Sequence, residues 1–350
     1  MIKALLGVLA LAVFPAQAAT VVGQVVVPGG EPAAAAEQGK ALDALKANAN
    51  RGAMVDQYTL AELYLRGKTV PRDLVQAARW YRKAAYQGHA DAQYKTFVCL
   101  NFGLGVPEDK LEAFSWLQKA VAQGHPRAHH STGIVYEFGD CGQARDLAAA
   151  VKYYQKASDL ADPDGTKSLA TCYQMGIGVP ADMRKALELY QKAADLGQPV
   201  AQVILAGFYL EGKQFPRDPM RGFELAQKSA VAGLGRGQFT LGVLYYQGLG
   251  TPRDLSQAVS WYRKAVESGE VSALYNLGYC YAVGEGVAVD KAEAYAHWTL
   301  AAESMPQVKD SLRRLTNSLS ASELAAGKTR YAALRATVES RRIDTLLVGY

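Results

Sequence analysis

Apolar and polar positions recur along this chain in a pattern that repeats about every 36 residues. Each period holds two stretches whose apolar residues lie three or four apart, as on one face of an α-helix, and glycine-rich segments separate them. Two columns mark the period. One is a lysine, followed by alanine except at Lys228, at Lys83, Lys119, Lys156, Lys192, Lys228 and Lys264, and the other is an aspartate at Asp73, Asp109, Asp146, Asp182, Asp218, Asp254 and Asp290. A fixed period of this length predicts an all-α solenoid of stacked helix pairs.

The first helix of each unit is predicted from its leucine and tyrosine columns and ends at a glycine. Glycine adopts the left-handed conformation that closes a helix at little cost. The core columns are Leu60, Leu169, Leu205, Leu241 and Leu277, followed by Tyr64, Tyr136, Tyr173, Tyr209, Tyr245 and Tyr281.

The second helix of each unit is predicted to begin at the aspartate, whose carboxylate can accept hydrogen bonds from the first turn. Small residues four positions later allow close packing, at Ala77, Ala113, Ala150, Ala186, Gly222, Ala258 and Ala294. We expect the large residues three positions further on to fill the core, at Trp80, Trp116, Tyr153, Leu189, Leu225 and Trp261.

These columns resemble the SEL-one-like repeat family (SLR), a relative of the tetratricopeptide repeats. The seventh unit matches the family phrase, although His297 replaces the usual aromatic residue, at Ala273, Leu277, Gly278, Tyr281, Gly284, Gly286, Val287, Asp290, Ala294 and Ala301. The resemblance covers about residues 53–303. It implies a right-handed α-solenoid of about seven helix-turn-helix repeats that binds proteins, without indicating which partner.

The first residues have the pattern of a secretory signal peptide. Lys3 precedes an apolar run over residues 4–14, and Ala16 and Ala18 have the small size typical of a cleavage site. The run is too short to span a bilayer, and no other segment is long and apolar enough to do so. The sequence therefore predicts an exported protein, periplasmic or secreted.

The repeats leave distinct segments at both ends. We expect a signal peptide over residues 1–18, a flexible leader over 19–35 and an N-terminal half-repeat cap over 36–52. Seven repeats follow over 53–304, and residues 305–350 form capping helices that end in a loose tail.

Charge and motifs favour a non-enzymatic scaffold for protein–protein interaction. The net charge of +5 lacks the dense basic clusters typical of nucleic-acid binding. The chain has no G-x-S-x-G, H-E-x-x-H or Ser-x-x-Lys motif, so we expect no cofactor. His125 and His129 could face one metal, but Pro126 places His125 outside the helix, and a solvent-exposed or stacking role is favoured over a metal site. Two alternatives remain. One is an enzyme acting on the cell wall or on β-lactams, since β-lactam binding or hydrolysis is linked to cysteine-rich members of the family, although their paired-cysteine spacing is not met here. The other is a secreted factor that binds a host protein.

The four cysteines fall into two classes. Cys99, Cys172 and Cys280 share a core position of the first helix, where buried thiols are expected. Cys141 lies in the irregular loop of the third unit, beside an inserted residue. Because an exposed thiol is a liability in an exported protein, we predict a disulfide from Cys141 to Cys99 or Cys172.

One stripe of the first helices is unusually apolar in units five to seven. In the family the first helix lines the concave face, and the residues on this stripe are Val203, Leu210, Phe239, Val243, Tyr246, Tyr275 and Tyr279. Units three and four instead carry polar residues there, including His130, Glu137 and Lys167. Since aromatic residues dominate interface energetics, we predict that this stripe binds a protein or peptide. The alternative is that the curvature of the solenoid buries it.

Overall fold

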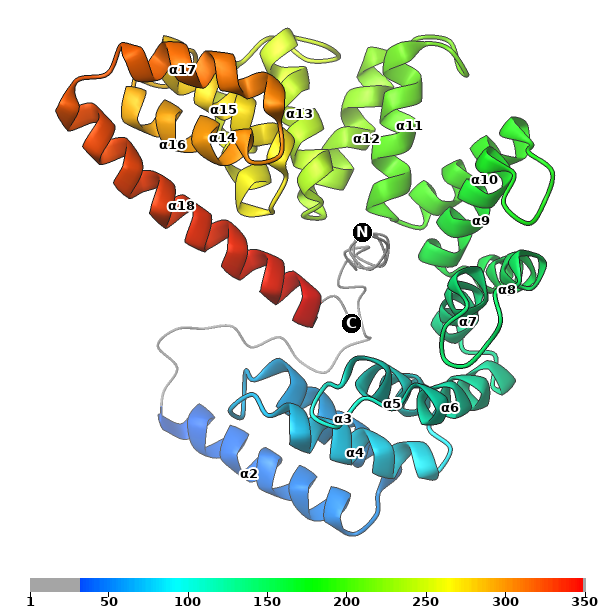
Figure 1. Ribbon diagram of the computed structural model, residues 1–350. Coiled ribbons are helices and arrows are strands. Elements are labelled where there is room, and N and C mark those ends of the chain that lie inside the picture. Colours follow the sequence, from blue (N-terminus) through cyan, green and yellow to red (C-terminus); the bar gives the residue numbers. More distant parts are fainter. Residues whose placement is uncertain (1–31, 349–350) are drawn as a thin grey trace. The chain divides into compact units, whose positions relative to one another are not determined.

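A computed structural model describes residues 32–348, with side chains over 39–338, and this part of the chain is helical without strands (Figure 1). Seven helix pairs follow one another: α3 (Met54–Arg66) and α4 (Leu74–Tyr86), α5 (Ala90–Phe102) and α6 (Lys110–Ala122), α7 (Pro126–Phe138) and α8 (Leu147–Asp159), α9 (Pro163–Met175) and α10 (Met183–Asp195), α11 (Pro199–Glu211) and α12 (Pro219–Val231), α13 (Gly235–Gln247) and α14 (Leu255–Glu267), α15 (Val271–Val283) and α16 (Lys291–Ala302). Helix α2 (Pro32–Asn50) precedes them, and η1 (Pro306–Val308), α17 (Lys309–Asn317) and α18 (Ala321–Val348) follow.

The described chain forms two compact units, which divide within α10 between residues 189 and 190. In the N-terminal unit each helix packs on the next along the chain, from α2 to α9. In the C-terminal unit the same order runs from α11 to α16, and α17 and α18 both pack on α16. Each of these two compact units, which hold several repeat units each, is therefore a stack of helix pairs, as the period of the sequence predicts.

The aspartate column begins the second helices as expected. In each pair a side-chain oxygen of the aspartate accepts a hydrogen bond from a backbone N–H in the first helical turn. The aspartate's own N–H donates to the carbonyl of the preceding first helix, at the tyrosine column, as from Asp254 to Tyr245 at 3.0 Å. The aspartate thus caps one helix and fixes the turn that leads from the other.

The second glycine of the connecting loop allows neighbouring pairs to stack. Gly250 has φ +71°, and a Cβ built on it would lie 2.0 Å from the carbonyl oxygen of Pro219, the first residue of α12. Three other loops show the same close approach, at 2.1–2.3 Å: Gly105 on Leu74, Gly178 on Leu147 and Gly286 on Leu255. In these four loops the position requires glycine for two reasons, its backbone conformation and its contact with the preceding pair.

The core confirms the leucine and small-residue columns and corrects the large-residue column in three of its six units. The five leucines are at most 1% exposed, and so are the alanines of the small-residue column. Trp80, Trp116 and Leu225 are buried as predicted, at 7%, 2% and 3% exposed. Trp261, expected in the core, is only half-buried, as are Tyr153 and Leu189. In these three units the next residue is the buried one, at Tyr154, Tyr190 and Tyr262, each 1% exposed.

The predicted disulfide of Cys141 is wrong. All four cysteines are free and buried. Cys99, Cys172 and Cys280 each pack into the core cluster of a different helix pair. Cys141 has φ +52° in its loop, which turns its thiol inward, and Sγ donates to Asn101 Oδ1 at 3.2 Å. Burial and the nearby Asp140 carboxylate raise the pKa of Cys141 to about 11, so the thiol is protonated rather than reactive.

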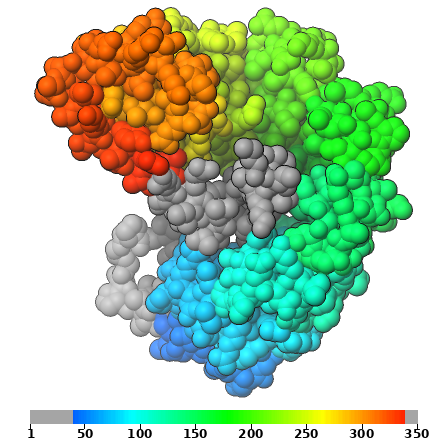
Figure 2. Space-filling model, in the orientation of Figure 1, coloured from blue at the N-terminus to red at the C-terminus, as the bar shows by residue number. Residues whose placement is uncertain are grey.

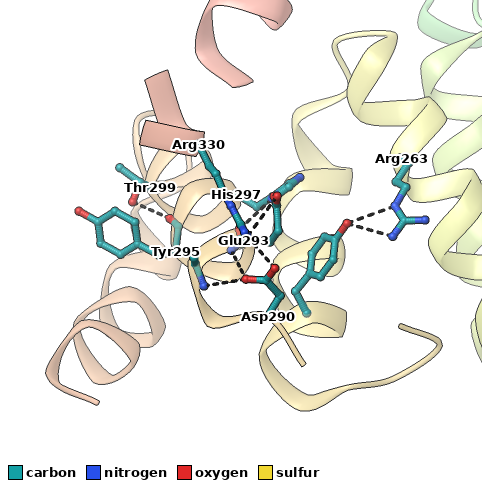
Figure 3. A network of polar contacts seen from close by, with 9 residues as sticks. Arg263, Asp290, Glu293, Tyr295, His297, Thr299 and Arg330 are labelled. Atoms are coloured by element: carbon teal, nitrogen blue, oxygen red, sulfur yellow. Dashed lines mark hydrogen bonds and ion pairs between the residues drawn. The ribbon is translucent and has the colours of Figure 1, made fainter. Parts of the chain in front are cut away.

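The C-terminal helices cap the last pair. A capping box begins α18, because Glu323 N donates to Ser320 Oγ and Ser320 N donates to the Glu323 carboxylate. Arg330 reaches from α18 to Asp290, with Nη1 2.6 Å from Oδ2, and to Glu293 at 3.3 Å (Figure 3). In the space-filling view the red residues of α18 lie against the orange ones of the preceding helices (Figure 2).

Both end helices are longer than expected. Helix α2 begins at Pro32, four residues before the predicted cap, and α18 continues to Val348, through most of the predicted loose tail. The chain has neither glycine nor proline between residues 328 and 348, so no helix-breaking residue interrupts α18. The predicted signal peptide and most of the leader lie outside the described residues. Within residues 32–348, none of the helices combines the length and apolarity needed to cross a membrane.

Candidate protein-binding surface

The predicted stripe, which we call the first-helix stripe, lies on α11, α13 and α15 of the C-terminal unit. Its seven residues range from buried to exposed. Val203 is 8% exposed and Tyr279 is 37% exposed, and the other five have intermediate exposure. The stripe is therefore neither a fully solvated surface nor a closed core.

Two aromatic residues of the stripe rest on rings that come from the second helices. Phe239 lies over Tyr262, with ring centroids 6.0 Å apart, and Tyr275 stacks on Trp298 at 6.1 Å. Gly242 and Gly278 make room for those rings, because a Cβ on either would lie 2.7 Å or less from the ring below. Phe239 and Tyr275 thus cover the core and leave only one face for a partner.

Leu210 also belongs partly to the core. Gly222 on α12 faces it, since a Cβ built on that glycine would lie 2.9 Å from Leu210 Cγ. Together with buried Val203, Leu210 makes the α11 end of the stripe a packing surface. The alternative reading, in which packing buries the stripe, therefore applies to α11.

Tyr246 connects units six and seven. Its hydroxyl donates to Glu285 Oε2 at 2.5 Å, and the Arg253 guanidinium lies over its ring at 5.6 Å. The hydrogen bond to Glu285, with burial and the charge of that carboxylate, raises the pKa of Tyr246 to about 12. Sequence reasoning missed Glu285 and Arg253, because both lie in the glycine-rich loops. Their position next to the stripe adds charge to a surface predicted from apolar residues alone.

Tyr279 is the stripe residue most available to a partner. It lies between the buried residues Gly278 and Cys280 on α15 and, at 37% exposed, is the stripe residue with the most accessible surface. Val243, which is partly buried, occupies the equivalent position one unit earlier. Apolar area with hydroxyl groups at its edge suits recognition of a polypeptide, which offers both apolar side chains and backbone acceptors.

Two histidines of the cluster lie against tyrosine rings. His125 caps α7, where Nδ1 accepts from Ala128 N at 3.1 Å, and its ring stacks on Tyr94 with centroids 4.8 Å apart. His129 lies near the Tyr153 ring at 6.1 Å. Over the described residues there is no group of three or more His, Cys, Asp or Glu side chains arranged to hold a metal ion.

Comparison with known proteins finds the same repeat along the whole array. The sequence model of the Sel1 repeat matches residues 56–89, 90–125, 126–162, 167–198, 199–234, 235–270 and 271–304. A Sel1 repeat protein from Oxalobacter formigenes is 30% identical, with a TM-score of 0.61, over 69% of this chain and 97% of that one. Cysteine rich protein B from Helicobacter pylori is 30% identical over 39% of this chain and 98% of its own, with a TM-score of 0.32. A protective antigen of uropathogenic Escherichia coli with an SLR fold is 24% identical over 88% of this chain and 89% of its own, with a TM-score of 0.35. No curated protein matches.

Proposed function

This chain belongs to the Sel1 repeat family, and we propose that it is an exported scaffold that binds a protein partner through the part of the first-helix stripe on α13 and α15. Proteins of this family are generally protein-interaction scaffolds without enzymatic activity. The proposal goes further by naming the surface and the compartment.

One observation carries the choice of surface. On α13 and α15 the stripe combines partly buried apolar residues with the exposed residue Tyr279, and Tyr246 joins the sixth and seventh repeats through Glu285. A rigid aromatic surface loses little conformational entropy on binding, which is why tyrosine is frequent among residues that dominate affinity.

The experiment is binding of a purified partner, obtained by pull-down with the mature protein, to the variant Tyr279→Ser. If the stripe is the binding surface, Kd should rise about 30-fold or more, as for a residue that dominates an interface. Met220→Ser on α12 is the matched control, because Met220 is 68% exposed, belongs to the same C-terminal compact unit as Tyr279 and lies outside the stripe. Equal affinity of wild type and Tyr279→Ser, with unchanged circular dichroism, would contradict the proposed surface.

Export rests on the first eighteen residues alone. If residues 1–18 form a signal peptide, the mature protein begins near Ala19 and is found in the periplasm or the medium. Fractionation followed by N-terminal sequencing tests this. A full-length protein in the cytoplasmic fraction would contradict it.

A further inference from the structure

A column of buried glutamines connects the first helices to the chain before and after them. In four units the glutamine Nε2 donates to a backbone carbonyl eight residues earlier, at Gln57, Gln93, Gln202 and Gln238. Each of these side chains is at most 7% exposed. Their Oε1 atoms remain to be satisfied, because a buried acceptor without a hydrogen bond costs free energy.

In three of these units the acceptor is satisfied by a residue 30 positions later, at the end of the second helix. Gln87 Nε2 donates to Gln57 Oε1 at 2.8 Å. Ser268 Oγ donates to Gln238 Oε1, also at 2.8 Å. The donor is therefore a carboxamide or a hydroxyl supplied from one sequence position of the repeat.

The second unit shows the arrangement most completely. Gln123 Nε2 donates to Gln93 Oε1 at 2.8 Å and to the Gly88 carbonyl at 2.9 Å. A primary amide carries two N–H groups, so these two acceptors together satisfy both of them. The pair of acceptors is thus suited to the end of a glutamine side chain.

The fifth unit has both acceptor residues but a different residue at the donor position. Gln202 and Gly197 correspond to Gln93 and Gly88, and Ala232 stands where Gln123 stands in the second unit. Alanine has no donor to offer. Gln202 Oε1 accordingly accepts no hydrogen bond from the described residues, although the side chain is only 5% exposed.

An open pocket lies at this point, with both Gln202 and Ala232 in its lining. Its volume is about 390 Å³, and it is lined by Gly197, Gln202, Gln227, Lys228, Val231 and Ala232. This is near the lower end of the range for small-ligand sites, roughly 300–1,000 Å³, and enough for one side chain. The lining is mostly apolar, and Val231 is 74% exposed, so an apolar contact surface lies beside Gln202.

We infer that this pocket binds the side chain of a glutamine presented by a protein partner. Gln202 Oε1 is buried in the free protein, so binding requires a shift of this side chain toward the pocket. The guest's carboxamide then takes the place that Gln123 takes in the second unit, donating to Gln202 Oε1 and the Gly197 carbonyl. Its methylene groups lie against Val231 and Ala232. A glutamate side chain cannot replace it, because an ionised carboxylate has no N–H to donate to the two acceptors. This site lies on α11 and α12 and does not depend on the surface proposed on α13 and α15.

The test is a titration of isotope-labelled full-length protein with N-acetyl-glutamine amide, followed by NMR. N-acetyl-norvaline amide is the apolar control probe, and N-acetyl-glutamate amide is the charged one. We expect saturable shifts of the Gln202 side-chain amide and the Ala232 backbone amide with the glutamine probe, with Kd on the order of 1 mM for so small a ligand. Both control probes should bind at least about tenfold more weakly.

Two variants make the result specific. Ala232→Gln supplies the donor from within the chain and should abolish the shifts while raising Tm by about 2 °C, since the buried acceptor is then satisfied. Gln123→Ala produces the same arrangement in the second unit and should create a second binding site, reported by the side-chain amide of Gln93. The inference is overturned if the norvaline probe shifts the same signals equally, if glutamate binds better through Lys228, or if Ala232→Gln leaves the shifts unchanged. It is also overturned if no probe shifts Gln202, which would mean that water alone satisfies the acceptor.

Discussion

The structure predicts that two adjacent aromatic residues of α14 contribute very differently to stability. Tyr262 is 1% exposed, its ring fills the space above Gly242, and its hydroxyl accepts a hydrogen bond from Asn276 Nδ2 at 3.2 Å. Trp261 is half-buried, and the Lys264 ammonium lies 3.9 Å from the centroid of its ring. Tyr262→Ala should therefore destabilise much more than Trp261→Ala.

The magnitudes follow from burial. Removing a buried aromatic side chain costs about 3–5 kcal/mol of unfolding free energy, and Tyr262→Ala also leaves Asn276 without its partner. Trp261→Ala loses part of its apolar contact and a cation–π interaction, together about 1–2 kcal/mol. Tyr262→Phe removes only the hydroxyl and should lower the unfolding free energy by about 1 kcal/mol.

The assay is urea unfolding of the full chain followed by far-UV circular dichroism, with amide hydrogen exchange to assign the transition to residues 190–350. Stacked repeats can unfold in steps, so the local exchange data are needed beside the global curve. Equal costs for the two alanine variants, or a larger cost for Trp261→Ala, would refute the assignment of Tyr262 as the core residue.

Three further predictions test other features. Gly250→Ala should lower Tm more than Gly269→Ala. Both glycines have φ above +70°, but only at Gly250 would the added Cβ collide with a neighbouring carbonyl. An equal fall in Tm for the two variants would contradict this contact. Burial lowers the pKa of His297 to about 4, so the folded chain binds fewer protons than the unfolded chain between about pH 6.5 and 4, and stability falls as pH drops through that range. In urea titrations, His297→Phe should reduce the difference in unfolding free energy between pH 7 and pH 4 by up to roughly 3 kcal/mol. If the variant keeps the pH dependence of the wild type, other groups cause the loss of stability. Thiol titration in denaturant without reductant should find four free thiols, with slow reaction of Cys141 in the native state, and two thiols would restore the rejected disulfide.

Much of the fold could be predicted from the sequence because its determinants are local and repeated. The aspartate cap and the closing glycine act within one turn of the chain, so residues such as Asp254 and Gly248 identify their helix ends directly. Repetition then averages out exceptions, and the period survives even where the third unit has an irregular loop.

The sequence predicted less well where a side chain's direction or a distant partner decides. Trp261 and Tyr262 are adjacent and both large, and a helical wheel separates them by only about 100°, too little to decide which one fills the core. Cys141 was misjudged because its inward direction depends on a positive φ in the loop.

The candidate surface was predicted only in part for the same reason. The apolar stripe was visible in the sequence, but the packing of Leu210 on Gly222 and the bond from Tyr246 to Glu285 join residues that are 12 and 39 positions apart. The sequence did not predict the pocket at Gln202, because the recurring glutamines have the pattern of a solvent-exposed polar helix face. Only their hydrogen bonds show that these side chains are buried.

The proposal that α13 and α15 form the binding surface is tested most directly by site-specific photo-crosslinking in cells that make the protein. A photoreactive phenylalanine analogue replaces Tyr279 in one variant and Met220 in the other, since both side chains are exposed in the same unit. We predict a discrete protein adduct from position 279 and none from position 220. No adduct from position 279, or the same adduct from both positions, would contradict the assignment of this surface.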